Sequence, residues 1–183
     1  MKKAITLTFF CLALTIASYS QSLQNKNEQQ SNAEKFSETS GTLIQKEFID
    51  IGTIGSTKIQ VAVFTDVISG KKSSAVRFEK SAYSSLGSDT KVGVLDADEL
   101  DGLIKSLKII SDKVFPTIAT NYTEVSFVSR GGLSAGCFWG KDKKWSTYIK
   151  VEKYDGDSYQ FFSKKDDFDN FITYLEKAKT QMI

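Results

Sequence analysis

The sequence predicts an α+β fold built from two tandem ββββα units, at 43–112 and 123–182, whose antiparallel sheets are each covered by one amphipathic helix. Three observations predict this fold. Apolar residues recur at every second position in several short segments, which is the period of a strand buried on one face. Each half of the chain then changes to the 3.6-residue period of an amphipathic helix. The apolar positions of the two helices also match at a constant offset of 68 residues, which favours an internal repeat with one shared core.

Residues 1–20 have the pattern of a secretory signal peptide. Lys2 and Lys3 form a basic start, an apolar stretch follows over 4–17, and small residues precede a cleavage point after Ser20. The alternative is an uncleaved membrane anchor, but the apolar run is shorter than the ~20 residues that a spanning helix needs. No later stretch of the sequence is apolar enough to cross a bilayer. We therefore expect an exported protein, periplasmic or extracellular.

The segment 21–42 is expected to be a flexible polar linker. It is rich in Gln, Asn, Ser and Glu, and its large apolar residues are Leu23 and Phe36. Such a composition buries too little apolar surface to offset the entropy lost on ordering. A single folded domain is therefore expected over 43–183.

Four strands are expected in the first unit, around 48–51, 59–67, 76–79 and 92–94. Turns rich in glycine, serine and lysine separate them. A helix follows, and its apolar stripe consists of Leu100, Leu103, Ile104, Leu107 and Ile110. Asp96 and Glu99 stand three residues apart at its start, which is the spacing of a capping box. Pro116, the sole proline, marks the end of this helical segment.

The second unit repeats this order of elements. Strand-like alternation occurs at 125–127, 133–139, 145–151 and 159–161. The Asp-Gly-Asp run at 155–157 is the signal of a tight hairpin before the last of these strands. The second helix carries its apolar residues at the spacing of the first, and these are Phe168, Phe171, Ile172 and Leu175.

Four strands and a helix that opens with acids, repeated twice, is an order similar to the PUR and whirly-type repeats of single-stranded nucleic-acid binders. The segments that carry the resemblance are 92–107, which begins VGVLDADEL, and 161–175, which begins FFSKKDDF. The resemblance lies in the architecture and covers most of 43–182. It implies an aromatic and basic sheet face on which bases stack.

The charge balance weighs against nucleic-acid binding as the main function. The chain has 24 Lys and Arg against 22 Asp and Glu, and removal of Lys2 and Lys3 with the leader leaves equal numbers of the two signs. Neutralisation of phosphates supplies much of the affinity for nucleic acids, so a neutral domain is a poor candidate. The lysines at 71–72 and 141–144 are expected in turns. A single-stranded nucleic-acid-binding module is therefore kept as the alternative function.

The sequence predicts no catalytic, metal or cofactor site. It contains no histidine, which removes histidine bases, Ser-His-Asp triads and the usual zinc sites. Cys137 is the one cysteine outside the leader, so no internal disulfide is expected, and its apolar surroundings in sequence predict burial in the core. The clustered acids at 96–101 and 166–169 stand where first helical turns favour acids, which explains them without calcium or catalysis. We therefore expect a protein that is not an enzyme.

Large aromatic residues gather in the hairpins of the second unit. The strand alternation places Trp139 and Trp145 toward the core, and Tyr148 and Tyr154 toward solvent. The simplest role for such residues is to complete the core, but an exposed group of them could stack on a sugar or a peptide. The sequence thus predicts an exported, non-enzymatic binding or accessory domain for a glycan, peptide or protein ligand. Its candidate ligand-binding residues are Tyr148, Tyr154 and Trp145.

Overall fold

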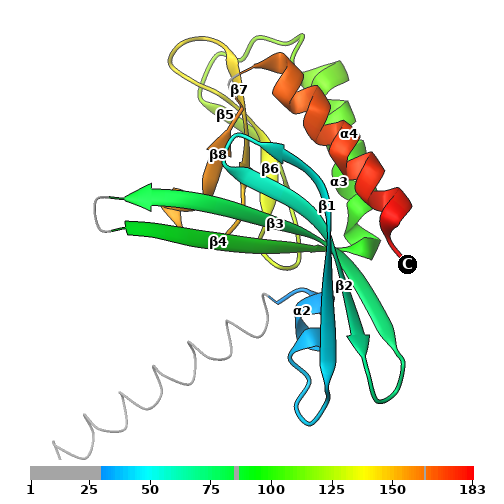
Figure 1. Cartoon of the computed structure of the whole chain (residues 1–183). Helices are drawn as coiled ribbons and strands as arrows, with labels where there is room; N and C mark the ends of the chain where they lie inside the picture. Colours follow the sequence, from blue (N-terminus) through cyan, green and yellow to red (C-terminus); the bar gives the residue numbers. More distant parts are fainter. Residues whose placement is uncertain (1–29, 85–86, 163) are drawn as a thin grey trace, which may run out of the picture. The chain divides into compact units, whose positions relative to one another are not determined.

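The computed structural model describes residues 30–84, 87–162 and 164–183, so the predicted signal peptide and the linker residues 21–29 lie outside the described part. After a short helix, the chain forms two blocks, and each has four strands followed by a long helix (Figure 1). The elements are α2 (Asn32–Ser37), β1 (Ile44–Ile54), β2 (Thr57–Asp66), β3 (Lys72–Ser84), β4 (Gly87–Asp96), α3 (Ala97–Ile109), η1 (Ile110–Val114), β5 (Thr123–Val128), β6 (Ser134–Trp139), β7 (Trp145–Lys150), η2 (Gly156–Ser158), β8 (Tyr159–Phe161) and α4 (Lys165–Gln181).

Two antiparallel sheets of four strands confirm the predicted fold class. The first sheet has the order β1-β2-β3-β4 and the second has the order β5-β6-β7-β8, so each strand pairs with its neighbours in sequence. Each block of strands is followed by a helix, α3 after the first sheet and α4 after the second. The two halves therefore share the same strand order, as the repeat predicts. The signal at 155–157 forms the 3-10 turn η2 rather than a tight hairpin, in the longer connection between β7 and β8.

The helices bury the predicted apolar stripes. Leu100, Leu103, Leu107 and Ile110 are at most 2% exposed, and Phe168, Phe171 and Leu175 are at most 1% exposed. One hydrophobic core joins these helix residues to inward-facing residues of both sheets, as expected for units that share a core. The helices are not divided one to a sheet, however. They pack side by side (Figure 1); α3 contacts both sheets, and α4 packs chiefly on β1 and β2.

A close approach between the two units occurs at Gly93 of β4. A Cβ atom at this position would overlap the main-chain carbonyl oxygen of Val151, which follows β7. Glycine is therefore required by the contact and not by its backbone conformation. The contact brings the first sheet against the end of β7 in the second, and so helps to set how the strands of the second unit are placed.

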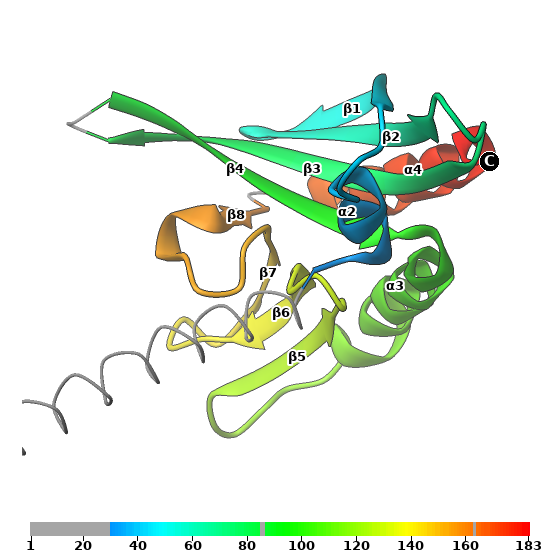
Figure 2. The same ribbon diagram turned by 90° about the horizontal axis from the view of Figure 1, so that it is seen from below.

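The expectation of a flexible linker over 21–42 is wrong for the C-terminal part of that segment, because residues 32–37 form the helix α2. Ser31 and Glu34 form a reciprocal capping box, with the Ser31 Oγ accepting from the Glu34 N–H at 3.1 Å and the Glu34 Oε2 accepting from the Ser31 N–H at 2.8 Å. Ala33 is 1% exposed, and together with the half-buried Phe36 it packs on an apolar patch of the first sheet, formed by Ala62, Phe64, Ala75 and Val94. Figure 2 shows α2 against this sheet. The folded unit begins at Ser31.

Asp96 fixes the N-terminus of α2 on the first sheet by hydrogen bonds. Its carboxylate accepts hydrogen bonds from the main-chain N–H groups of Asn32 at 2.7 Å and Ala33 at 2.9 Å. It therefore caps α2, which is more than sixty residues distant in sequence, and makes no side-chain cap bond to α3. The predicted capping box between Asp96 and Glu99 is wrong for this reason.

Cys137 is fully buried in the core, as predicted. Burial raises the pKa of its thiol from 9.0 to about 12, and the nearby Glu124 carboxylate acts in the same direction. The folded state therefore favours the protonated thiol. This contribution to stability is complete below pH 9 and is lost as the pH rises toward 12.

We expect the urea midpoint of the wild type to fall between pH 8 and pH 10.5, and that of Cys137→Ala to fall by less. Urea titrations of both proteins at the two pH values check this, and an identical fall in both would contradict it.

We also expect Cys137 to react with a thiol reagent only on unfolding, because its sulfur is shielded from solvent in the folded state.

Candidate functional site

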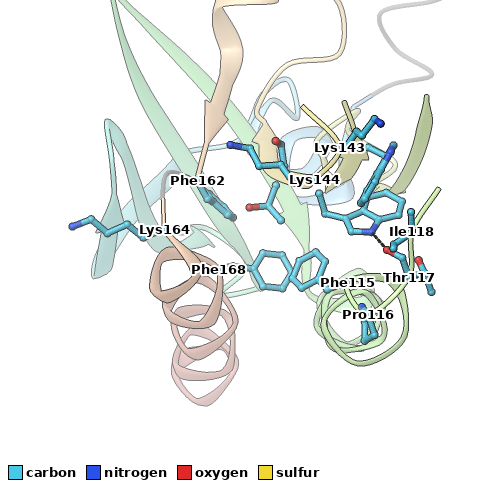
Figure 3. A pocket seen from close by; sticks show the side chains of 13 residues that line it. Phe115, Pro116, Thr117, Ile118, Lys143, Lys144, Phe162, Lys164 and Phe168 are labelled. Atoms are coloured by element: carbon cyan, nitrogen blue, oxygen red, sulfur yellow. Dashed lines mark hydrogen bonds between the residues drawn. The ribbon is translucent and has the colours of Figure 1, made fainter. Parts of the chain in front are cut away.

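A cavity of about 660 Å³ lies beside Trp145 and is the candidate functional site (Figure 3). We call it the Trp145 pocket. Three segments that are distant in sequence meet there: the residues after η1, the β6–β7 hairpin, and the start of α4 together with Phe162 and Lys164 before it. The residues that line it are Phe115, Pro116, Thr117, Ile118, Trp139, Lys143, Lys144, Trp145, Ser146, Thr147, Phe162, Lys164 and Phe168.

The base of the pocket consists of phenylalanine rings that belong to the core. Phe168, from the first turn of α4, is 1% exposed. Its ring centroid lies 5.2 Å from that of Phe115 and 6.2 Å from that of Phe162. Because these rings are fixed by the packing of α4, the base is a preformed apolar surface.

One wall consists of the two tryptophans. Trp139 of β6 and Trp145 of β7 are direct partners in the sheet, and their rings meet edge to face with centroids 5.4 Å apart. The Trp145 indole N–H donates to the main-chain carbonyl of Thr117 at 2.9 Å, drawn as the dashed line in Figure 3. This bond fixes the orientation of the half-buried indole and ties β7 to the segment after η1. Trp145, predicted as a binding candidate, thus faces inward as the alternation predicts and lines a cavity there.

Lysines are the charged residues of the lining. Lys143 and Lys144 come from the β6–β7 turn, and Lys164 precedes α4 with its side chain extending away from the phenylalanine rings (Figure 3). Lys144 Nζ lies 3.1 Å from a carboxylate oxygen of Asp142, a residue that does not line the pocket. Within the described part of the chain, no carboxylate oxygen lies within 4 Å of Lys143 Nζ. The pocket therefore combines apolar walls with a positively charged rim.

A second hollow, of about 640 Å³, lies beside the first. We call it the Tyr122 pocket. It shares Ile118, Trp139 and Lys143 with the Trp145 pocket. Its other lining residues are Ala119, Thr120, Asn121, Tyr122, Gly140 and Lys141.

Tyr148 lies on the outer face of the second sheet, as predicted, but its predicted exposure is wrong. The residue is 3% exposed. Its direct partner on β6 is Gly136. Its hydroxyl reaches beyond that strand and donates to Glu124 of β5 at 2.6 Å. Phe138 and Tyr159 flank the ring, with centroids at 6.4 and 5.3 Å. Burial, followed by the bond to Glu124, raises the pKa of this phenol.

Tyr154 is 81% exposed, in the connection between β7 and β8, and Lys153 Nζ lies 5.1 Å from its ring centroid. It lines neither pocket. The structure therefore does not bring the three candidate residues together, because Trp145 and Tyr148 lie on opposite faces of one strand. The more exposed aromatics of the outer face are instead Tyr122, at 69%, and Phe161, at 51%.

The acids at the start of α3 surround an arginine. Asp96, Asp98 and Glu99 bring carboxylate oxygens within 4.8 Å of one another. The Arg130 guanidinium pairs with Asp96 and, at 2.9 Å, with Asp98, while its main-chain N–H donates to Glu99 at 2.7 Å. The hydrogen bond to Arg130 lowers the pKa of Asp98. These acids therefore join the β5–β6 connection to α2 and α3 and have a structural explanation.

Most residues of the Trp145 pocket carry no signal in the sequence that predicts a site. Phe115, Thr117 and Ile118 follow α3 and η1 as an ordinary connection, and the sequence predicts Lys143 only as a residue of a solvated turn. These residues form a pocket because the segment after η1 packs against the β6–β7 hairpin, some thirty residues later in the sequence.

Comparisons with known proteins give no match: no family model, no curated protein and no solved structure matches this chain. The resemblance to PUR and whirly-type repeats therefore stays a prediction from element order. A shared architecture does not establish a shared function, which depends on the chemistry of the site.

Proposed function

We propose that this chain is an exported, non-enzymatic binding domain that takes an apolar or aromatic ligand in the Trp145 pocket. The observation that carries the proposal is a preformed cavity of about 660 Å³ whose base and wall consist of aromatic rings. Ligand pockets commonly enclose about 300–1,000 Å³ and combine apolar walls with a few polar groups. The hydroxyls and lysines of the lining supply such groups here.

The chemistry of the lining supports binding rather than catalysis. Its hydroxyl groups come from Thr117, Ser146 and Thr147, and among the described lining residues none is a carboxylate or an imidazole that could act as their base. Cys137 is not a lining residue, and its raised thiol pKa disfavours the reactive thiolate.

The exported location rests on the predicted signal peptide at 1–20, with its lysines followed by an apolar stretch. Within the described residues, no helix has the length and apolar character needed to traverse a bilayer. We propose a periplasmic or extracellular protein whose binding site is part of the folded unit that begins at Ser31.

The nucleic-acid alternative is second because the outer face of the first sheet carries paired charges. On the first sheet, α2 covers part of the outer face. The charged residues beyond it include the pairs Lys58–Asp50, at 2.9 Å, and Arg77–Glu79. A face on which acids partner the basic groups neutralises few phosphates.

Fluorescence tests the proposed function, because the chain's two tryptophans, Trp139 and Trp145, both line the pocket. The probe is N-phenyl-1-naphthylamine, a neutral aromatic dye. We expect it to bind the folded protein and change the tryptophan emission. We expect Trp145→Ala to weaken its binding at least tenfold, because that substitution removes one of the two indole rings that form the wall.

Tyr154→Ala is the matched control, because it removes an exposed aromatic residue outside both pockets. Thermal unfolding shows that each variant is folded, and Trp145→Phe serves as a second variant if Trp145→Ala is not. Equal dye affinity in wild type and Trp145→Ala would overturn the proposal. Binding of a thymidine decamer that weakens with salt and is unaffected by Trp145→Ala would support the nucleic-acid alternative instead.

A further inference from the structure

We infer that the ligand of the Trp145 pocket is an amphiphilic anion, whose negatively charged group binds Lys143 and whose apolar body lies along the tryptophan wall. This inference rests on the proposed function and specifies its ligand class. It follows from the charge of the two pockets, the backbone of Lys143 and the position of that residue between the pockets.

The charge of the lining has one sign. The Trp145 pocket is lined by Lys143, Lys144 and Lys164, the Tyr122 pocket adds Lys141, and no acid is among the described lining residues of either. The sequence outside the predicted leader has equal numbers of acidic and basic residues. The linings of the two pockets therefore carry a positive net charge, whereas the sequence outside the predicted leader is neutral on average. Beside apolar walls, such charges attract an anion more strongly than they would in open solvent.

The backbone of Lys143 is unusual. Its φ is +55°, and within the described residues it is the one residue other than glycine with a positive φ. Its N–H donates to the carbonyl of Gly140 at 3.2 Å, which closes the turn. Glycine or asparagine adopts this conformation at lower cost, so a lysine here carries a small strain. Strain of this kind is found at functional positions, where the side chain is needed for another purpose.

Lys143 also lies at the junction of the two pockets. It lines both of them, as do Ile118 and Trp139. An elongated ligand can therefore place its apolar body against Trp139 and Ile118 while its anionic group meets Lys143. Lys144 is a weaker candidate for this contact, because Asp142 already neutralises part of its charge.

The ligand class is a ring system or an alkyl chain bearing one carboxylate, sulfonate or phosphate. A neutral ligand leaves the lysines unused. A small inorganic anion leaves the aromatic walls wet, so the two parts of the lining together select an amphiphile. A charge-assisted hydrogen bond to one ammonium group is expected to improve the affinity about tenfold.

Two dyes that differ by one sulfonate test this inference. N-phenyl-1-naphthylamine is neutral, and 1-anilinonaphthalene-8-sulfonate carries the sulfonate on the same ring system. At low ionic strength we expect the sulfonated dye to bind about tenfold more tightly to the wild type. We expect salt to reduce that preference, because the rim is open to solvent. Lys143→Asn removes the charge with a residue that tolerates the turn, and it should abolish most of the preference, measured as the ratio of the two dyes' affinities for the same variant.

Lys105→Gln is the control, because it removes an exposed lysine of α3 that lines neither pocket, and it should keep the full preference. Equal affinities of the two dyes in the wild type would overturn the inference while leaving the proposed function intact, provided that both dyes still depend on Trp145. A full preference retained in Lys143→Asn would overturn the assignment to Lys143.

Competition experiments separate the two sources of such an anion. Dodecanoate should displace the sulfonated dye if the pocket accepts an alkyl chain, and 1-naphthalenesulfonate should displace it if the pocket requires a ring. Either result supports an amphiphilic anion. Equal displacement by dodecanoate and by the neutral dodecanol, which lacks the carboxylate, would contradict the inference.

Discussion

Phe171→Ala is expected to lower the free energy of unfolding by about 3–5 kcal/mol, the usual cost of truncating a buried phenylalanine. Phe171 lies on α4 and is fully buried. Its ring meets Phe78 of β3 edge to face at 6.2 Å between centroids, and Phe162, after β8, at 5.4 Å. It therefore packs an element of each unit around one helix, and its removal leaves a cavity that neither sheet can fill without moving the other.

Urea unfolding at equilibrium measures this loss, with Phe161→Ala as the control. Phe161 is the same residue type, but it is 51% exposed on the outer face of the second sheet. Phe161→Ala should lower the free energy of unfolding by clearly less than Phe171→Ala, because less of the Phe161 side chain is buried. A loss of under about 1 kcal/mol for Phe171→Ala would show that α4 does not pack on the first sheet through this residue.

Asp96→Ala is expected to cost about 3 kcal/mol, because one carboxylate performs two tasks. It caps the N-terminus of α2 through the N–H groups of Asn32 and Ala33, and it pairs with Arg130. Asp96 is 3% exposed. Its removal leaves two helix N–H groups without their acceptor and takes a buried partner from the guanidinium. We therefore expect α2 to detach from the first sheet before the rest of the domain unfolds.

Amide hydrogen exchange distinguishes this local effect from a general loss of stability. In Asp96→Ala, the N–H groups of 32–37 should exchange faster than those of the first sheet. Asp98→Ala removes the more exposed partner of Arg130, and as an exposed ion pair it should cost less than about 1 kcal/mol and leave α2 protected. Equal losses in Asp96→Ala and Asp98→Ala would contradict the capping role. Asp96→Asn, which keeps an acceptor oxygen, should be intermediate.

Parts of the fold could be predicted because their signals are local. The stripe from Leu100 to Ile110 and the stripe from Phe168 to Leu175 follow the helical period, and each is buried as that period requires. The two sheets follow from alternation between turns, since consecutive strands with short connections pair in sequence order. The alternation also gave the correct face for Trp145 and Tyr148.

The errors arose where a distant residue decides the outcome. Tyr148 faces outward, yet Phe138 and Tyr159 flank its ring, and Glu124 of β5 accepts a hydrogen bond from its hydroxyl. The segment 31–37 is polar in composition, yet Asp96 caps it and a patch of the first sheet receives Ala33. Neither partner can be identified from the local sequence, because each lies at a separation that only the folded chain closes.

The sequence alone predicts two similar α+β units in tandem and core residues on their inward faces, and the structure confirms both. Apolar periodicity is enough for this, because burial of one face is the dominant local driving force. Only the tertiary structure shows that α3 contacts both sheets while α4 packs chiefly on the first, that α2 is docked, and that Trp145 lines a pocket with Lys143. These features depend on which distant surfaces meet, and that is set by packing over the whole domain rather than by the period of any one segment.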